Sequence, residues 1–301
     1  MDIGFCVIYF LKNMCFSFGM KTELCQGYLL GDYVLEELLR DGEYSSVWRA
    51  RPLEEEGVVA LKVLQSRDQA RFRSEAESLS RLRHQNIVWL IRSDLENNPP
   101  YHVLEYVSCS LESRKLGFLG DWRATAVLGV KLAQGLSYAH EQGVVHRDFS
   151  FTNILLKGDE PVICDFDLPD VEISSVVQSA GSSHRWYGTF DHIALEQYRT
   201  GYGSPKADVY SLASVLYNLV TGESPKWSRP SLDRIARAPP WFSRAVERCL
   251  SVRPENRYDA GQLALVLDKG LAQSRHPQTL WERFGLVVDR FLGFFSRSKN
   301  Y

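Results

Sequence analysis

Hydrophobic and polar positions alternate in short runs over the first third of the chain. This two-residue period predicts five strands, at residues 33–40, 46–51, 58–64, 87–91 and 101–106. Between the third and the fourth the period becomes helical over residues 71–82, where one face carries Phe72, Ala76, Leu79 and Leu82. The pattern therefore predicts a small sheet-rich region that contains one helix.

From residue 110 onward the pattern is mostly helical. Residues 124–142 form one long amphipathic stretch, which Gly143 follows at the position where glycine is favoured after a helix. A second helix is predicted over residues 206–220, because Ser204 can cap its start, Pro205 suits its first position and Gly222 suits its end. A sheet-rich lobe followed by a larger, mainly helical lobe is an α+β architecture, with the joint predicted near Glu105 and Val107.

Composition narrows the class of protein but does not identify it. The 301 residues are 45% hydrophobic and 24% charged, which is ordinary for a soluble globular protein. A formal net charge of −2 gives no electrostatic reason to expect a nucleic-acid partner. The six cysteines lack the spacing of a metal site, so we expect reduced thiols in a cytoplasmic protein.

Segments at both ends lie outside the predicted folded domain of residues 28–271. Within residues 1–27, the apolar run at 3–11 is far shorter than the roughly 20 residues of a membrane-spanning helix. An over-long start assignment and a short anchor are the two interpretations of this extension. Residues 272–301 show helical spacing of apolar side chains from Leu280 to Phe295, which predicts an amphipathic helix.

The amphipathic C-terminal helix has three interpretations. It can dock onto the large lobe of its own chain, form a dimer contact, or lie on a membrane surface. Arg290, Arg297 and Lys299 near its aromatic face support the membrane interpretation, while docking onto the chain's own lobe needs no further partner. The predicted location is therefore cytoplasmic, with peripheral membrane contact as an open alternative.

One stretch of polar residues carries the chemistry. Phosphoryl transfer from ATP needs oxygen ligands for Mg²⁺ and a carboxylate near the attacking hydroxyl. Residues 146–153 read His-Arg-Asp-Phe-Ser-Phe-Thr-Asn, and Asp165-Phe166-Asp167 begins twelve residues after Asn153. The first stretch resembles the protein-kinase catalytic loop H-R-D-x-x-x-x-N, and the second resembles D-F-G with its glycine replaced.

The resemblance implies a two-lobed protein-kinase fold and a set of site residues. Asp148 matches the aspartate that orients the substrate hydroxyl, and Asn153 and Asp165 match the ligands of Mg²⁺ or Mn²⁺. Lys62, in Val-Ala-Leu-Lys, matches the strand lysine that contacts the phosphates. Glu75 matches the helix glutamate that holds this lysine, and Glu77 is the alternative.

The resemblance also implies an ATP-binding set around the lysine. Residues 39–47 align with the phosphate-covering loop L-G-x-G-x-x-G-x-V, although Gly42 is the one glycine of three that is kept. Glycine there lets the backbone approach the phosphates, so we expect a looser cradle. The implied ATP-binding residues are Leu39, Gly42, Tyr44, Val47, Ala60, Lys62, Leu104, Glu105, Val107 and Leu155.

Later motifs extend the resemblance over residues 33–271. Residues 188–196 resemble the end of an activation segment, G-T-x-x-Y-x-A-P-E, with His192 and Leu195 as replacements. Arg257 matches the arginine that pairs with the glutamate of this motif, here Glu196. The Gly-Thr pair at 188–189 favours serine/threonine over tyrosine specificity. Arg147 and the serines of residues 174–183 match control by activation-loop phosphorylation, and a flexible serine-rich loop is the alternative.

Two residues differ from the kinase motifs at positions that affect catalysis, so the sequence does not settle how active the enzyme is. Asp167 replaces a glycine, and Ser150 stands where serine/threonine kinases place a lysine that neutralises the transferring phosphoryl group. Losing one such electrostatic donor costs about 10²–10³ in rate. The prediction is an ATP-dependent serine/threonine kinase that also phosphorylates itself. A pseudokinase scaffold and a small-molecule phosphotransferase are the alternatives.

Overall fold

The computed structural model describes residues 24–166, 192–225, 232 and 237–275. These residues form two compact units. The first unit contains the described residues up to Arg67 together with Ile91–Tyr106. The second unit contains Asp68–Leu90 and the described residues from Val107 onward.

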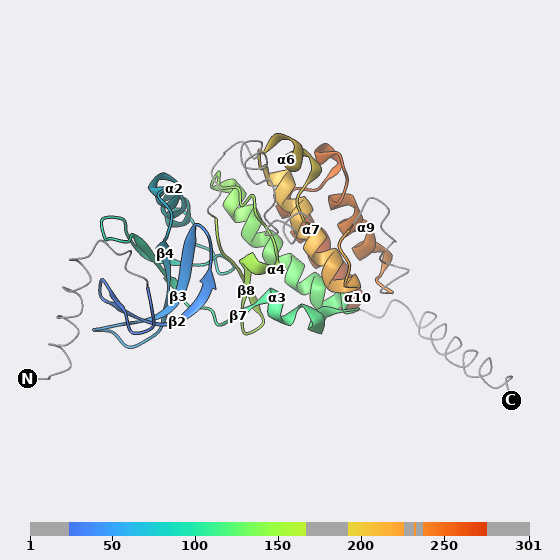
Figure 1. The fold of residues 1–301 in the computed structure, drawn as a ribbon. Coiled ribbons are helices and arrows are strands. Elements are labelled where there is room, and N and C mark those ends of the chain that lie inside the picture. Colours follow the sequence, from blue (N-terminus) through green and yellow to red (C-terminus); the bar gives the residue numbers. More distant parts are fainter. Residues whose placement is uncertain (1–23, 167–191, 226–231, 233–236, 276–301) are drawn as a thin grey trace, which may run out of the picture. The chain divides into compact units, whose positions relative to one another are not determined.

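The first unit is built on a six-stranded sheet (Figure 1). Its strands are β1 (Leu29–Leu30), β2 (Tyr33–Asp41), β3 (Ser45–Pro52), β4 (Val59–Leu64), β5 (Leu90–Asp94) and β6 (Tyr101–Glu105). They lie in the order β1-β2-β3-β4-β6-β5. The pairs β1–β2, β2–β3, β3–β4 and β4–β6 are antiparallel. The sheet order places β4 between β3 and β6, at the centre of the predicted ATP-binding strands.

The two faces of this sheet differ in chemistry. Successive side chains of a strand point to opposite faces, so Leu61 and Val63 of β4 share one face and Ala60 and Lys62 share the other. Leu61 and Val63 belong to a buried cluster whose other members are Leu30, Tyr33, Leu35, Trp48, Ala50, Tyr101 and Val103. The apolar face therefore forms the core of the unit, and Lys62 lies on the face opposite that core.

The second unit is mainly helical. Figure 1 shows its long helices packed side by side. They are α4 (Trp122–Glu141), α7 (Pro205–Thr221), α9 (Pro240–Cys249) and α10 (Ala260–Arg275). The other helical elements are α2 (Gln69–Ser80), α3 (Leu111–Arg114), η1 (Lys115–Phe118), η2 (Phe151–Asn153), α6 (Leu195–Thr200) and η4 (Pro254–Asn256). A small sheet in the order β7-β8-β9 comprises Cys109–Ser110, Ile154–Lys157 and Glu160–Ile163.

Local signals set the ends of the two predicted long helices. The Ser204 side chain accepts a hydrogen bond from the backbone N–H of Ala207, and Pro205 occupies the first turn of α7. The helix ends at Gly222, whose φ of 76° lies in the left-handed region that favours glycine. Asp121 caps α4 in the same way, by accepting from the N–H of Ala124. The predictions for these helices are confirmed.

One predicted strand was misplaced. Residues 87–91 were expected to form it, whereas β5 spans Leu90–Asp94. Ile87 and Val88 are buried because they join β9 of the second unit: Ile87 forms an isolated parallel bridge with Ile163, and the N–H of Val88 donates to the Ile163 carbonyl at 2.8 Å. An apolar run does not show which strand it will pair with.

Several predicted features lie outside the described residues. They are the extension up to residue 23, Asp167, the serines of residues 174–183, the Gly-Thr pair at 188–189 and the tail at 276–301. Among the helices that the structure describes, none combines the length and apolar character needed to cross a bilayer.

Candidate active site

The catalytic-loop residues are attached to helix α7 through one buried carboxylate. Asp208 accepts hydrogen bonds from the backbone N–H groups of His146 and Arg147, both at 2.8 Å. Its Oδ2 also lies 2.8 Å from Nε2 of His140, in the last turn of α4. Because one side chain bonds two successive amides, the backbone just before Asp148 has little freedom to rotate.

The backbone of this loop adopts a strained conformation. Arg147 has a φ of 68°, a left-handed value that costs a non-glycine residue about 1–3 kcal/mol. Such strain persists only where surrounding contacts hold it, as the hydrogen bonds of Asp208 do here. Asp165 has a φ of 70° and shows the same feature at the start of the second motif. Strained residues that cluster in this way are typical of functional sites.

Asn153 positions the carboxylate of Asp148. Its Nδ2 donates to the backbone carbonyl of Asp148 at 2.9 Å and to Oδ2 of the same residue at 3.1 Å. Asn153 is buried at the end of η2, so its amide is a fixed donor. The amide oxygen of Asn153 accepts from Oγ1 of Thr152 at 3.4 Å, and an amide oxygen is also a ligand that Mg²⁺ can bind.

His146 joins the two motifs. The backbone N–H of Asp148 donates to its Nδ1 at 3.3 Å, and its Nε2 lies 3.0 Å from the Cys164 carbonyl. Because a backbone N–H only donates and a carbonyl only accepts, Nδ1 is the acceptor and Nε2 carries the proton. The ring also packs against Phe166, with centroids 4.7 Å apart.

A backbone hydrogen bond brings the segments that carry Asn153 and Asp165 next to each other. The N–H of Cys164 donates to the Asn153 carbonyl at 3.0 Å, and Asp165 is the next residue. One carboxylate and one amide oxygen suit Mg²⁺, which commonly binds one or two protein ligands together with substrate phosphates. Within the described ranges there is no cluster of three or more His, Cys, Asp or Glu side chains that could hold a metal without such help. The two oxygen donors of Asn153 and Asp165 fit a metal ion that also binds phosphate oxygens.

Ser150 occupies the position where a lysine was expected for this type of kinase. It is buried, and its Oγ lies 3.0 Å from Oγ1 of Thr152. Position 150 therefore contributes a hydroxyl that is hydrogen-bonded within the loop.

In the first unit, four predicted ATP-binding residues share one face of the sheet. Val47 lies directly opposite Lys62, and Ala60 lies directly opposite Leu104. Since Ala60 and Lys62 are two residues apart on β4, all four side chains point to the face opposite the apolar core. The strand register alone assembles this set.

The loop that is expected to cover the phosphates joins β2 to β3. The N–H of Gly42 donates to the Ser45 carbonyl at 3.0 Å, and a Cβ at position 42 would lie only 2.7 Å from that oxygen. Close backbone contact thus requires the retained glycine. The Tyr44 carbonyl accepts from the N–H groups of Gln65 and Ser66 at 3.0 and 3.1 Å. Leu39 is exposed near the end of β2, and Glu105 ends β6.

The remaining predicted residues lie in the second unit. Burial separates the two candidate glutamates, because Glu75 is 2% exposed and Glu77 is exposed. Val107 is the first residue of the second stretch of that unit, and Leu155 is half-buried on β8. Lys62 and Glu75 belong to different units, so their ion pair stays a prediction.

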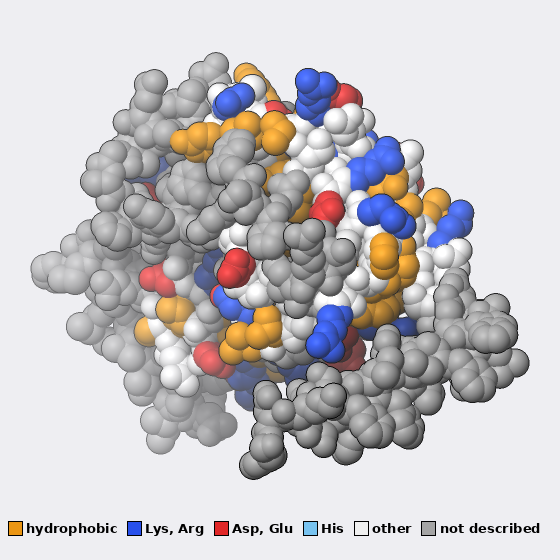
Figure 2. Space-filling model, turned by 90° about the vertical axis from the view of Figure 1, so that its right-hand side faces the viewer, with side chains coloured by type: hydrophobic (Ala, Val, Ile, Leu, Met, Phe, Trp, Pro, Cys, Tyr) orange, Lys and Arg blue, Asp and Glu red, His pale blue; other side chains and the backbone are white. Residues whose placement is uncertain are grey.

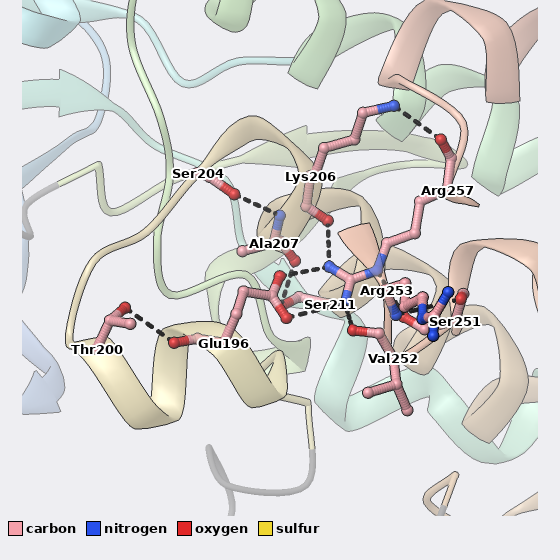
Figure 3. Close-up of polar contacts among 10 residues, drawn as sticks. All are labelled: Glu196, Thr200, Ser204, Lys206, Ala207, Ser211, Ser251, Val252, Arg253 and Arg257. Carbon is pink, nitrogen blue, oxygen red and sulfur yellow. Dashed lines mark hydrogen bonds and ion pairs between the residues drawn. The ribbon is translucent and has the colours of Figure 1, made fainter. Parts of the chain in front are cut away.

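Glu196 and Arg257 form the ion pair that the motifs implied (Figure 3). The Arg257 guanidinium donates to both carboxylate oxygens, at 2.5 and 2.9 Å. It also donates to the carbonyls of Lys206 and Ser251, at 2.9 and 2.8 Å. This bidentate contact fixes the start of α6 against η4 and α7.

Two residues beside the catalytic loop were not singled out from the sequence. They are His140, on the Asp208 carboxylate, and Gln197, whose Nε2 donates to the Arg147 carbonyl at 2.6 Å. Each lies in an ordinary helical pattern, and its partner is distant in sequence. No sequence signal marks either of them.

Comparisons with known proteins agree with these motifs. The family model described as "Protein kinase domain" matches residues 33–264. The receptor-like serine/threonine-protein kinase ALE2 of Arabidopsis thaliana is 36% identical over 209 residues, which are 65% of this chain and 27% of ALE2. Serine/threonine-protein kinase PknL of Mycobacterium tuberculosis is 29% identical over 265 residues, which are 80% of this chain and 65% of PknL. The chain therefore spans less than two thirds of either relative.

Solved structures show the same fold. The apo form of PpkA-294 has a TM-score of 0.68 at 24% identity, over 82% of this chain and 100% of that one. The PknI kinase domain of Mycobacterium tuberculosis has a TM-score of 0.64 at 20% identity, over 83% and 100% of the two chains.

Proposed function

The chain belongs to the protein kinase family, and from this premise we propose that it transfers the γ-phosphoryl group of ATP to serine or threonine hydroxyls of a protein substrate. The observation that carries the proposal is the hydrogen bonding of Asp148 by Asn153, with Asp165 next to the backbone partner of Asn153. Phosphoryl transfer depends on positioning and charge more than on covalent catalysis, and these residues supply both.

Each site residue has a role in this proposal. Asp148 accepts or orients the proton of the attacking hydroxyl, and Asn153 and Asp165 hold Mg²⁺ or Mn²⁺. The metal ion, when bound, neutralises charge on the phosphates. Lys62 contacts the phosphates and is held by Glu75, whose burial supports this choice over Glu77. The adenine and ribose bind against the face of the first unit that carries Val47, Ala60 and Leu104.

A serine or threonine acceptor is supported by the relatives. ALE2 and PknL are both named serine/threonine-protein kinases. We extend the proposal to autophosphorylation, with the serines of residues 174–183 as acceptors.

The second candidate is a pseudokinase scaffold, and Ser150 is the observation that favours it. A hydroxyl at this position cannot neutralise the transferring phosphoryl group. Under this alternative the chain binds nucleotide or a partner protein and transfers little phosphate.

The two candidates differ in one assay. Wild-type protein and Asp148→Asn are incubated with radiolabelled ATP, Mg²⁺ and a basic protein substrate, and labelled acceptor residues are identified after acid hydrolysis. Kinase activity predicts label on serine or threonine with the wild type and a loss of roughly 10²–10⁴-fold with Asp148→Asn. The exposed Asp159→Asn is the matched control and keeps full activity. Folded wild-type protein without label supports the scaffold.

The partner and the location are further proposals, because kinase family membership implies a protein substrate and the cysteine pattern favours the cytoplasm. The substrate is a protein in the cytoplasm. The tail at 276–301, by its amphipathic sequence, attaches to a membrane surface or a second copy of the chain. Flotation with anionic vesicles, with a chain ending at Gln273 as control, tests the membrane contact, and sedimentation of the same two chains tests the dimer.

A further inference from the structure

Arg147 is held from several directions by α6, α7 and the loop between them. Asp208 of α7 accepts its backbone N–H at 2.8 Å. Gln197 of α6 donates to its backbone carbonyl at 2.6 Å. Gly203, between the two helices, lies against its side chain. Because Asp148 follows directly, any rotation at Arg147 would redirect the carboxylate that is proposed to meet the substrate hydroxyl.

Gln197 controls one side of the Arg147–Asp148 peptide plane. The Arg147 carbonyl that it binds and the N–H of Asp148 belong to the same peptide group. That N–H donates to the His146 carbonyl at 2.9 Å, so the plane is held from both sides. Gln197 is 2% exposed, and its own carbonyl accepts the N–H of Gly201 at 2.8 Å. That bond joins backbone groups and caps α6, and the buried side-chain amide of Gln197 makes the separate bond to the Arg147 carbonyl, which favours one orientation of the peptide plane.

Gly203 leaves room for the stem of Arg147. A Cβ at position 203 would lie 2.4 Å from Cγ, 3.0 Å from Cβ and 3.1 Å from Cδ of Arg147. These atoms lie close to the strained backbone, so they cannot move aside as the far end of a long side chain can. An alanine at 203 would therefore push on the residue whose φ is 68°.

We propose that Gln197 and Gly203 are positioning residues that hold Arg147 in its left-handed conformation and so direct the Asp148 carboxylate. This inference rests on the proposed kinase activity and deepens it. The two residues act through Arg147 and have no contact with the reacting atoms in this account.

The test uses Gln197→Met, which removes the amide donor at similar length, and Gly203→Ala, in the full chain. Both are expected to lower kcat by roughly 10- to 100-fold with little change in KM for ATP. Both are also expected to speed hydrogen exchange in the peptide of residues 146–153. Gly117→Ala is the matched control, because a Cβ at 117 has nothing within 4 Å, and it leaves kcat and exchange unchanged.

A second variant tests the contact itself. Arg147→Gly removes the side chain that an alanine at 203 would meet, and glycine adopts a φ of 68° without strain. In the Arg147→Gly background, Gly203→Ala should cause no further loss of kcat and no further gain in exchange. An equal loss in both backgrounds would overturn the proposal for Gly203.

The outcomes separate this proposal from the proposed function. If the wild type transfers no phosphate, the kinase proposal fails, and hydrogen exchange at residues 146–153 still decides the positioning role. If both variants lower the melting temperature but leave exchange in that peptide and kcat per folded molecule unchanged, Gln197 and Gly203 are merely structural and the inference is wrong.

Discussion

Arg257 shows how a single buried charge is stabilised in the second unit. Its side chain is fully buried and donates to both oxygens of Glu196, while its guanidinium lies 4.9 Å from the ring centroid of Tyr210. Desolvating a cation is costly, so the arrangement is favourable only while the hydrogen-bond partners are complete. The pair thus makes α6, and with it Gln197, depend on η4.

We predict that Glu196→Ala lowers the free energy of unfolding by about 3 kcal/mol, because it leaves a buried cation without its carboxylate. Urea unfolding monitored by tryptophan fluorescence measures the change. The exposed Glu255→Ala is the matched control and should stay within about 0.5 kcal/mol of the wild type. Equal effects of the two substitutions would show that the ion pair contributes nothing specific.

Among single residues, the sequence predicted those that belong to motifs with a fixed spacing. The Glu196–Arg257 pair, and the placing of Asp148 beside Asn153, follow from motif spacing. Gln197 and His140 could not be predicted, because neither belongs to the motifs that carry the resemblance to protein kinases. The left-handed φ of Arg147 was equally hidden, since arginine has no preference for it.

The linker between α2 and β5 holds several elements of the second unit together. Arg83 donates its N–H to the Tyr138 hydroxyl of α4 at 3.2 Å, and the ring of His84 stacks on that of Tyr138 at 5.4 Å. Nδ1 of His84 accepts the N–H of Asn86 at 3.1 Å. Asn86 in turn donates to the Pro161 carbonyl at 2.8 Å. These contacts tie the end of the helix that carries Glu75 to α4 and β9.

This linker makes stability depend on pH. Burial lowers the pKa of His84 from its usual 6.5, and protonation would also remove the acceptor for Asn86. The unfolded chain therefore binds the proton more readily than the folded chain. The contribution of His84 to stability is present above pH 6.5 and is lost as the pH falls below it.

We predict that the wild type loses more unfolding free energy than His84→Asn between pH 7.5 and pH 5.5. Urea titrations at the two pH values measure the difference. Parallel losses in the two proteins would contradict the role of His84.

Several elements were predictable from their period, but α9 and α10, with 10 and 16 residues, were not predicted. The helices α4 and α7 and the strands β2, β3 and β4 lie within two residues of their predicted bounds. The strands β7, β8 and β9 have two to four residues each, and they form because they pair with one another. Pairing of this kind depends on the folded chain and leaves no period in the sequence.

At the scale of the whole molecule, the proposed activity needs both units. The first carries Lys62 and the face that is proposed to bind adenine, and the second carries Asp148, Asn153 and Asp165. Acidic, basic and hydrophobic side chains are interspersed on the face that Figure 2 displays, in keeping with a formal net charge of −2.

The central claim is that Asp148 accepts or orients the proton of the attacking hydroxyl, while Asp165 binds the metal ion. The most direct test is the rate of phosphate transfer as a function of Mg²⁺ concentration for the wild type, Asp148→Asn and Asp165→Asn. We predict that Asp148→Asn lowers the maximal rate by roughly 10²–10⁴-fold with an unchanged Mg²⁺ midpoint. Asp165→Asn should raise that midpoint by at least about tenfold. A shifted midpoint with Asp148→Asn, or an unchanged one with Asp165→Asn, would contradict this division of roles.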